Sequence, residues 1–234
     1  NFTKSIIMKK LEVFGAARLK GQIRISGSKN ASLPIMAATL LSDKKISLTN
    51  LPRVKDVETM IKLLKSMGSN VKVSKNKNSL IIRNNNKIKT EAGYNLMSTM
   101  RAGIIVLGPL LARFGKARVS SPGGCNIGFR PIDIHLEALK KMGVRYKIID
   151  GYINAKVKNG LIGAKIKFPK ISVGATENLM IAACLAKGQT VLSNCAIEPE
   201  IKDLSNFLCS IGAKIVWTGK RQVKIIGVKT FKQS

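Results

Sequence analysis

The apolar positions divide the chain into three similar segments. Each segment opens with an apolar stretch of helical length, continues through a short run rich in β-formers, and then enters a second helix. The apolar stretches are 27–41, 99–115 and 172–186, and the β-rich runs are 45–49, 117–121 and 190–193. The second helices end at Gly68, Gly143 and Gly212. Glycine at such an end predicts a left-handed residue that closes the helix.

Alternating runs follow each of these glycines and predict a strand hairpin that completes each unit. They start at 71–73, 145–149 and 214–217. The pattern therefore predicts an α/β domain with a pseudo-threefold repeat of helix, strand, helix and hairpin. Within it, Trp217 is interpreted as strand packing and the run 84–86 as a hairpin or loop tip.

Length and composition are those of a globular protein. The chain has 234 residues, of which 45% are hydrophobic, enough for a sizeable core. No apolar stretch approaches the length of a bilayer span, and the N-terminus shows no secretory pattern. We therefore expect a cytoplasmic protein with no membrane partner.

The formal net charge of +29 raises the possibility of a basic nucleic-acid-binding module. The excess is mostly lysine and is spread over the whole chain, and aromatic residues make up only 5%. Dispersed lysine is more typical of a solvated surface than of a nucleic-acid site, so no nucleic-acid partner is expected. Such a surface would still attract anionic small molecules.

The four cysteines show no paired metal-binding spacing, and the chain has a single histidine. We therefore predict no metal site. Cys184 lies in an apolar helical pattern and is predicted to be a core residue. Cys125 differs, because it lies in the glycine-bearing loop SPGGCNIGFRP at 121–131.

This loop leads into a predicted helix. Pro131 suits the first helical position, and Asp133 adds negative charge to the first turn. A helix N-terminus and the nearby Arg130 both favour the thiolate form of Cys125. On these features alone, a reactive thiol and an ordinary surface turn both remain open.

The sequence resembles the UDP-N-acetylglucosamine 1-carboxyvinyltransferase family, also called UDP-N-acetylglucosamine enolpyruvyl transferases. The segments that carry the resemblance are GSKNASLPIMAATLL, LPRVKDV, TMRAGIIVLGPLLARFG, SPGGCNIGFRPIDIHLEALKKMG, KISVGATEN and EPEIKDLSNFL. The most specific is PGGC followed by IGxRPxDxH, which separates the family from the related 5-enolpyruvylshikimate-3-phosphate synthases.

The resemblance implies a fold and an activity. The fold would be an inside-out α/β barrel of six repeats in two domains, of which three repeats form one domain. The activity would be transfer of the enolpyruvyl group of phosphoenolpyruvate to the 3-hydroxyl of UDP-N-acetylglucosamine, the first committed step of peptidoglycan synthesis. No metal or organic cofactor would take part.

The resemblance also implies roles for individual residues. Cys125 would protonate the methylene carbon and form an adduct with the antibiotic fosfomycin, while Lys29 and Arg130 would bind the phosphate-bearing substrate. The other substrate contacts would be Asn30, Arg101, Pro131, Ile132, Asp133, Ile134, Lys170, Ile171, Ser172, Val173 and Gly174. Without the resemblance, Lys29 also fits a solvated lysine, Asn30 a helix N-cap and Arg101 a cap on strand carbonyls.

Members of that family are nearly twice as long as this chain. We therefore expect residues 27–228 to form the three-repeat domain, and residues 1–26 and 229–234 to belong with a second domain that is mostly absent. A strand at 11–16 would be left unpaired. The 234-residue chain alone is then expected to need its C-terminal half for normal turnover, and a non-catalytic UDP-sugar-binding half-protein remains the alternative.

Overall fold

The computed structural model describes residues 12–15, 18–85, 87–121 and 132–233. The helices are α1 (Lys29–Ala38), η1 (Thr39–Leu41), α2 (Lys55–Ser66), α3 (Tyr94–Met97), η2 (Arg101–Val106), α4 (Leu107–Phe114), α5 (Asp133–Lys141), α6 (Val173–Ala183) and α7 (Pro199–Ser210). The strands are β1 (Ile46–Leu48), β2 (Asn70–Val73), β3 (Leu80–Arg83), β4 (Glu91–Ala92), β5 (Lys116–Ser120), β6 (Arg145–Ile149), β7 (Tyr152–Lys156), β8 (Lys165–Lys167), β9 (Gln189–Ser193), β10 (Lys214–Gly219) and β11 (Gln222–Ile226).

Three sheets repeat one strand order, which confirms the predicted threefold repeat. The orders are β1-β3-β2, β4-β5-β7-β6 and β10-β11-β9-β8. In each sheet the strand that follows the first helix pairs antiparallel with the last strand of the hairpin. The second and third sheets add one parallel strand, β4 beside β5 and β8 beside β9. In the described residues, β1 has no equivalent neighbour on its outer side.

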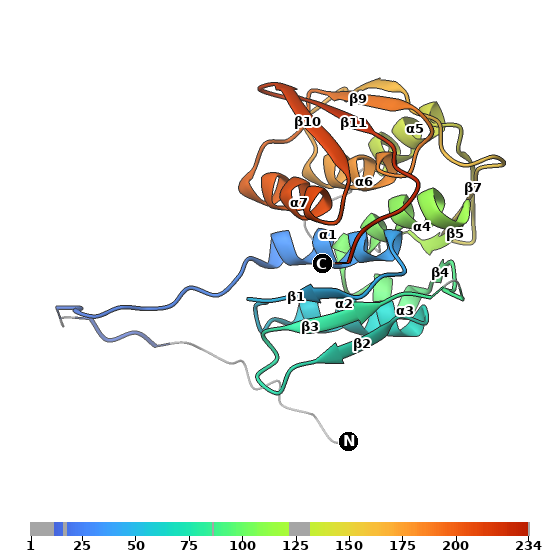
Figure 1. The fold of residues 1–234 in the computed structure, drawn as a ribbon. Helices are drawn as coiled ribbons and strands as arrows, with labels where there is room; N and C mark the ends of the chain where they lie inside the picture. The colour runs from blue at the N-terminus through green and yellow to red at the C-terminus, as the bar shows by residue number, and fades with distance from the viewer. Residues whose placement is uncertain (1–11, 16–17, 86, 122–131, 234) are drawn as a thin grey trace.

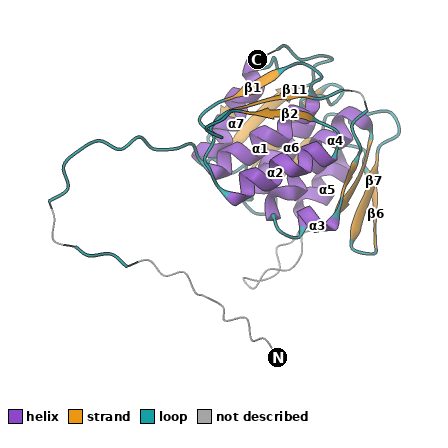
Figure 2. Ribbon diagram, turned by 90° about the horizontal axis from the view of Figure 1, so that it is seen from below, coloured by secondary structure: helices purple, strands orange, loops and turns teal. Residues whose placement is uncertain are grey.

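The helices gather in the middle of the molecule, with the strand hairpins around them (Figure 2). The burial pattern explains this arrangement. Nine of the eleven residues of α6 are buried, so this helix has no solvent face. Helices α2, α5 and α7 are amphipathic and bury one face each. Sheets outside a helical centre agree with the expected enolpyruvyl transferase type of fold, although these sheets do not close into a barrel.

The helix-ending glycines have the expected backbone. Gly68, Gly143 and Gly212 have φ values of 99°, 93° and 107°, which are accessible to glycine and strained for other residues. The strand positions also agree with the prediction to within two residues, and Trp217 packs against the core from β10. Its Nε1 donates to Ser205 Oγ on α7 at 3.4 Å.

Two local expectations differ from the structure. Helix α5 begins at Asp133, two residues later than expected from Pro131, which lies outside the described residues. The segment 11–16, expected to be an unpaired strand, is described only at 12–15, which pair with no described strand and expose Val13 and Phe14. Asn84, interpreted as part of a loop tip, is completely buried. Its Nδ2 donates to Thr39 O at 2.7 Å and its Oδ1 accepts from Ser69 Oγ at 2.6 Å, so it joins η1 to the end of β3.

Residues 18–28 leave the folded body as an extended segment before α1 (Figure 1). Ile23 and Ile25 are 87% and 79% exposed in this segment. Among the described helices, none has the length and apolar character needed to cross a lipid bilayer.

Candidate active site

Part of the predicted site falls outside the described residues. Cys125, Arg130 and Pro131 lie in the undescribed range 122–131. The backbone of Arg101 begins η2, and its side chain is not described. The helix η2 packs against both α1 and α6, so the Arg101 backbone belongs to the same helical cluster as the other predicted segments.

Lys29 lies at the first residue of α1 and makes an ion pair with a residue that the sequence analysis did not assign. Ser28 caps the helix by accepting from Ala31 N at 3.4 Å, so neither Lys29 nor Asn30 is the N-cap. Lys29 Nζ lies 3.0 Å from Asp56 Oδ2, in the first turn of α2. The Lys29 side chain is 48% exposed, and Asn30 is exposed beside it. The ammonium is therefore oriented by a carboxylate and still accessible to an anionic ligand.

The segment 170–174 forms the entry to α6. Lys170 and Ile171 are exposed, and Ser172, Val173 and Gly174 are half-buried. Ser172 is the N-cap, because its Oγ accepts from Ala175 N at 3.3 Å. This cap leaves other N–H groups of the first turn without intrahelical partners, which is the usual condition for binding phosphate oxygens at a helix start.

The segment 132–134 forms the entry to α5. Ile132 is the N-cap residue, Asp133 is exposed and Ile134 is buried. A cavity of about 160 Å³ lies between this helix and the chain that leaves β8. Its lining residues are Asp133, Ile134, Glu137, Ala138, Lys141, Ile166, Lys167, Phe168 and Pro169. The predicted contact segment 132–134 thus borders a small, mostly apolar cavity, and the segment 170–174 begins directly after its last lining residue, Pro169.

A buried polar group connects three of the predicted segments. Asn178 Nδ2, on α6, lies 3.1 Å from His135 Nδ1 on α5 and donates to Ile104 O in η2 at 3.1 Å. Burial lowers the pKa of His135 to about 4, and the nearby Asp133 carboxylate offsets only part of this effect. The His135 ring is therefore neutral at physiological pH.

Glu177 adds a second buried titratable group to α6. Only 7% of this residue is exposed. Burial raises the pKa of Glu177 to about 8, and the negative charges of Glu200 and Glu198 add to the shift. Glu177 is therefore largely protonated at neutral pH, next to the predicted nucleotide-sugar contacts.

The described cysteines offer no reactive thiol inside the fold. Cys184 and Cys195 are completely buried, and burial raises the pKa of both, that of Cys195 to about 12. Cys184 Sγ donates to Met180 O at 3.3 Å, which confirms its assignment to the core. Cys209 is exposed. Among the described residues, no group of three or more His, Cys, Asp or Glu side chains is arranged to hold a metal ion.

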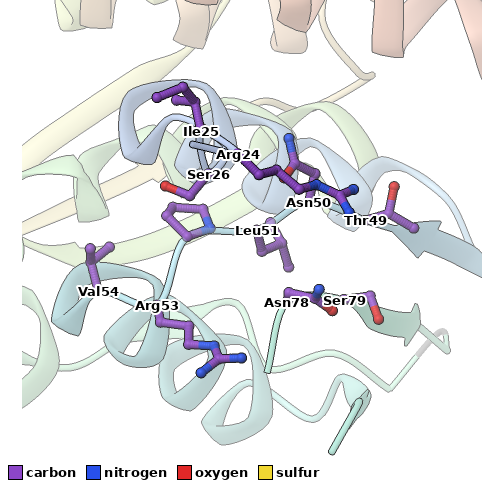
Figure 3. A pocket seen from close by; sticks show the side chains of 11 residues that line it. Arg24, Ile25, Ser26, Thr49, Asn50, Leu51, Arg53, Val54, Asn78 and Ser79 are labelled. Carbon is purple, nitrogen blue, oxygen red and sulfur yellow. The ribbon is translucent and has the colours of Figure 1, made fainter. Parts of the chain in front are cut away.

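A larger hollow of about 700 Å³ lies between the extended segment before α1 and the loop that follows β1. Figure 3 shows Arg24 extending toward Thr49 and Asn50, whereas Arg53 lies on the other side of Leu51. The two guanidinium groups do not converge, and none of the predicted site residues lines this hollow. We therefore place the candidate site at the starts of α1, α5 and α6.

The sequence analysis missed Asp56, Asn178 and the roles of His135 and Glu177. Asp56 lies in LPRVKDV, one of the segments that carry the resemblance, so a signal for it was present. His135 and Asn178 are 43 residues apart in the chain, and no local pattern predicts a contact between them.

Comparisons with known proteins identify relatives of the chain. The chain is 72% identical over 226 residues to a UDP-N-acetylglucosamine 1-carboxyvinyltransferase of Pelagibacter ubique, covering 97% of this chain and 54% of that protein. It is 51% identical to the protein of that name from Saccharophagus degradans, covering 95% of this chain and 53% of that protein. The chain thus spans about half the length of these curated relatives. The resemblance inferred from the motifs is confirmed.

Solved structures show the same fold at low sequence identity. The enolpyruvyl transferase NikO from Streptomyces tendae aligns with a TM-score of 0.79 at 19% identity, covering 94% of this chain and 51% of that one. An EPSP synthase from Acinetobacter baumannii aligns with a TM-score of 0.71 at 17% identity, covering 91% of this chain and 48% of that one. Residues 13–234 match the family profile of EPSP synthase (3-phosphoshikimate 1-carboxyvinyltransferase). The chain therefore belongs to the EPSP synthase family of carboxyvinyltransferases.

Proposed function

We propose that this chain forms one half of an enzyme that transfers the enolpyruvyl group of phosphoenolpyruvate to the 3-hydroxyl of UDP-N-acetylglucosamine. The observation that carries the proposal is Lys29, held by Asp56 at the start of α1 and still open to an anion. It is supported by the high identity to relatives that bear this enzyme's name.

The reaction adds the sugar oxygen to C2 of phosphoenolpyruvate while a proton is delivered to its methylene carbon. Loss of a proton from that carbon and of phosphate then restores the double bond. In this proposal the Cys125 thiol supplies the first proton, and Lys29 and Arg130 offset the charge of the phosphate and carboxylate groups. Asn30 and Arg101 complete the contacts to the two substrates.

The nucleotide part of the sugar substrate is assigned to the two helix entries. Residues 131–134 and 170–174 would contact the uridine diphosphate through backbone N–H groups and through the side chains of Asp133 and Lys170. The small cavity beside Ile134 and Phe168 is of a size and polarity suited to part of a nucleoside. Residues 27–228 would form the domain that carries this site, and residues 1–26 and 229–234 would join the other half.

A binding titration of the 234-residue chain tests the proposal. We expect UDP-N-acetylglucosamine to give saturable heat or NMR shifts, with no measurable release of phosphate from phosphoenolpyruvate. An oligonucleotide titrated at rising salt is the comparison. Binding of the oligonucleotide with a steep salt dependence, and no response to the nucleotide sugar, would favour the nucleic-acid alternative instead.

Fosfomycin labelling tests the thiol separately. The thiolate opens the epoxide and gives a stable thioether, so a single mass increase is expected on the peptide that holds Cys125. The increase should disappear in Cys125→Ala and persist in Cys209→Ala, the matched control at an exposed cysteine. Equal labelling of both cysteines would contradict the assignment.

A further inference from the structure

The buried contact among His135, Asn178 and Ile104 joins three segments for which the proposed function requires a fixed arrangement. Ile104 lies three residues after Arg101 in η2, His135 follows Ile134 directly, and Asn178 lies one helical turn after Gly174. Each segment is thus held within about one turn of its predicted substrate contacts. Asn178, on α6, thus hydrogen-bonds to both η2 and α5.

The geometry fixes the role of each polar atom. Asn178 Nδ2 carries two protons, and its two neighbours at 3.1 Å are Ile104 O and His135 Nδ1. A carbonyl oxygen can only accept, so the amide nitrogen must face Ile104. The second proton then goes to His135 Nδ1, which must be unprotonated. A neutral ring with its proton on Nε2 satisfies this arrangement. In a doubly protonated ring, the N–H of Nδ1 would face the N–H of Asn178 Nδ2, and no hydrogen bond could form.

Close packing leaves little alternative to this arrangement. Asn178 Oδ1 is buried without a hydrogen-bond partner, and a Cβ at Gly108 would lie 2.3 Å from it. A Cβ at Gly174 would lie 3.4 Å from His135 Cε1, so the start of α6 rests against the imidazole ring. The Asn178 amide thus uses both N–H donors and leaves its oxygen without a hydrogen bond. Burying that oxygen costs free energy of folding, which an apolar side chain at this position would avoid.

We propose that His135 and Asn178 are positioning residues that hold the starts of η2, α5 and α6 in register for the nucleotide-sugar substrate. This inference rests on the proposed function. Neither side chain needs to touch the substrate. Their effect is to make Arg101, the 132–134 segment and the 172–174 segment one rigid unit, so that the ordering is complete before the ligand binds.

Three substitutions at His135 test this role in the 234-residue chain. His135→Leu keeps approximate volume but removes the acceptor, and His135→Gln keeps a polar group but moves the acceptor away from the Nδ1 position. His135→Asn places an oxygen near the Nδ1 position. We expect the dissociation constant for UDP-N-acetylglucosamine to rise about tenfold in the first two variants and to stay within about threefold of the parent in His135→Asn.

A destabilised control separates positioning from general stability. Leu208→Ala removes a buried side chain from α7 and is expected to lower the melting temperature at least as much as the His135 substitutions. It should leave the dissociation constant unchanged. Equal weakening by Leu208→Ala, or no recovery in His135→Asn, would overturn the proposal.

Hydrogen exchange gives a readout that needs no ligand. In His135→Leu and His135→Gln, the amides of 101–106, 132–136 and 172–178 should exchange faster together, while those of the first sheet stay unchanged. If the parent chain binds no nucleotide sugar but the three segments loosen together, the proposed function fails, and His135 and Asn178 still hold the three segments together, without a role toward that ligand. If they do not loosen together, the positioning role is wrong, whatever the ligand result.

Discussion

Lys29 Nζ and Asp56 Oδ2 lie 3.0 Å apart and join the first turns of α1 and α2. Both side chains are more than one third exposed, so solvent screens the pair and its contribution to stability is small. The contact therefore serves mainly to orient the Lys29 side chain. Asp56→Asn should change the free energy of unfolding by less than about 1 kcal/mol in a urea titration.

The same substitution should weaken binding of phosphoenolpyruvate, because the ammonium loses its fixed direction. Glu58→Gln, also on α2, removes the exposed ion pair between Glu58 and Lys77; it is the matched control and should change neither the free energy of unfolding nor the binding of phosphoenolpyruvate. A loss of stability well above 1 kcal/mol in Asp56→Asn would show that the pair is structural.

The stability of the protein should fall as the pH rises toward 8, because of Glu177. The folded state keeps the proton up to a pKa of about 8, whereas the unfolded chain loses it near the ordinary value of 4.5. Between these values the unfolded state binds fewer protons, so rising pH favours unfolding. Glu177→Gln should remove this dependence and stabilise the protein by roughly 3 kcal/mol more at pH 8 than at pH 5. Denaturant titrations at both pH values measure the difference.

The opposite dependence is expected from His135 at lower pH. Its pKa is about 4 in the folded state and 6.5 in the unfolded chain, so stability is present above 6.5 and is lost as the pH falls toward 4. The full effect is about 3 kcal/mol. Because the chain has one histidine, its ring signals can be followed by NMR without ambiguity. A ring that titrates near 6.5 in the folded protein would contradict the buried, neutral assignment.

Gly108→Ala should destabilise the helical centre. The new Cβ would lie 2.3 Å from Asn178 Oδ1 and 2.5 Å from Asn178 O, so α4 and α6 would have to separate. Overpacking of this kind typically costs about 2 kcal/mol. Thermal unfolding measures the loss. Gly219→Ala is the control, since its Cβ would meet only a side-chain carbon at 3.8 Å. Equal melting temperatures for the two variants would exclude the clash.

The described cysteines should differ sharply in reactivity. A thiol reagent added to the folded protein should label Cys209, which is exposed, and leave Cys184 and Cys195 unlabelled. Burial both blocks access to these two thiols and raises their pKa values. Peptide mass spectrometry before and after unfolding in urea gives the comparison, and early labelling of Cys184 would show that the centre opens readily.

The repeat could be predicted from the sequence because its signals are local. Apolar stretches, β-rich runs and helix-ending glycines recur in one order, and each has a short-range physical cause. Asn84 shows where such reasoning fails. A run of asparagines is typical of an exposed turn, yet Asn84 is buried because its amide bonds to Thr39 and Ser69, which are distant in the sequence. The contact between His135 and Asn178 escaped prediction for the same reason.

The candidate site was predictable only where a motif marked it. Lys29 and the entries to α5 and α6 were identified by resemblance, and the structure gives Lys29 an ion-pair partner and α6 a side-chain N-cap. Their roles in binding remain predictions, as do those of Cys125 and Arg130. Glu177 lies in KISVGATEN, but its importance follows from its burial in α6, which the motif alone does not indicate.

The outer side of β1 carries a practical consequence. In the second and third sheets the corresponding side is occupied by β4 or β8, but in the described residues β1 presents its backbone groups without a neighbouring strand. This free edge of β1 can pair with a strand from another molecule, and the exposed Ile23 and Ile25 of the extended segment add apolar surface for such a contact. Self-association should therefore grow with protein concentration, and dilution series belong beside every titration and melting curve.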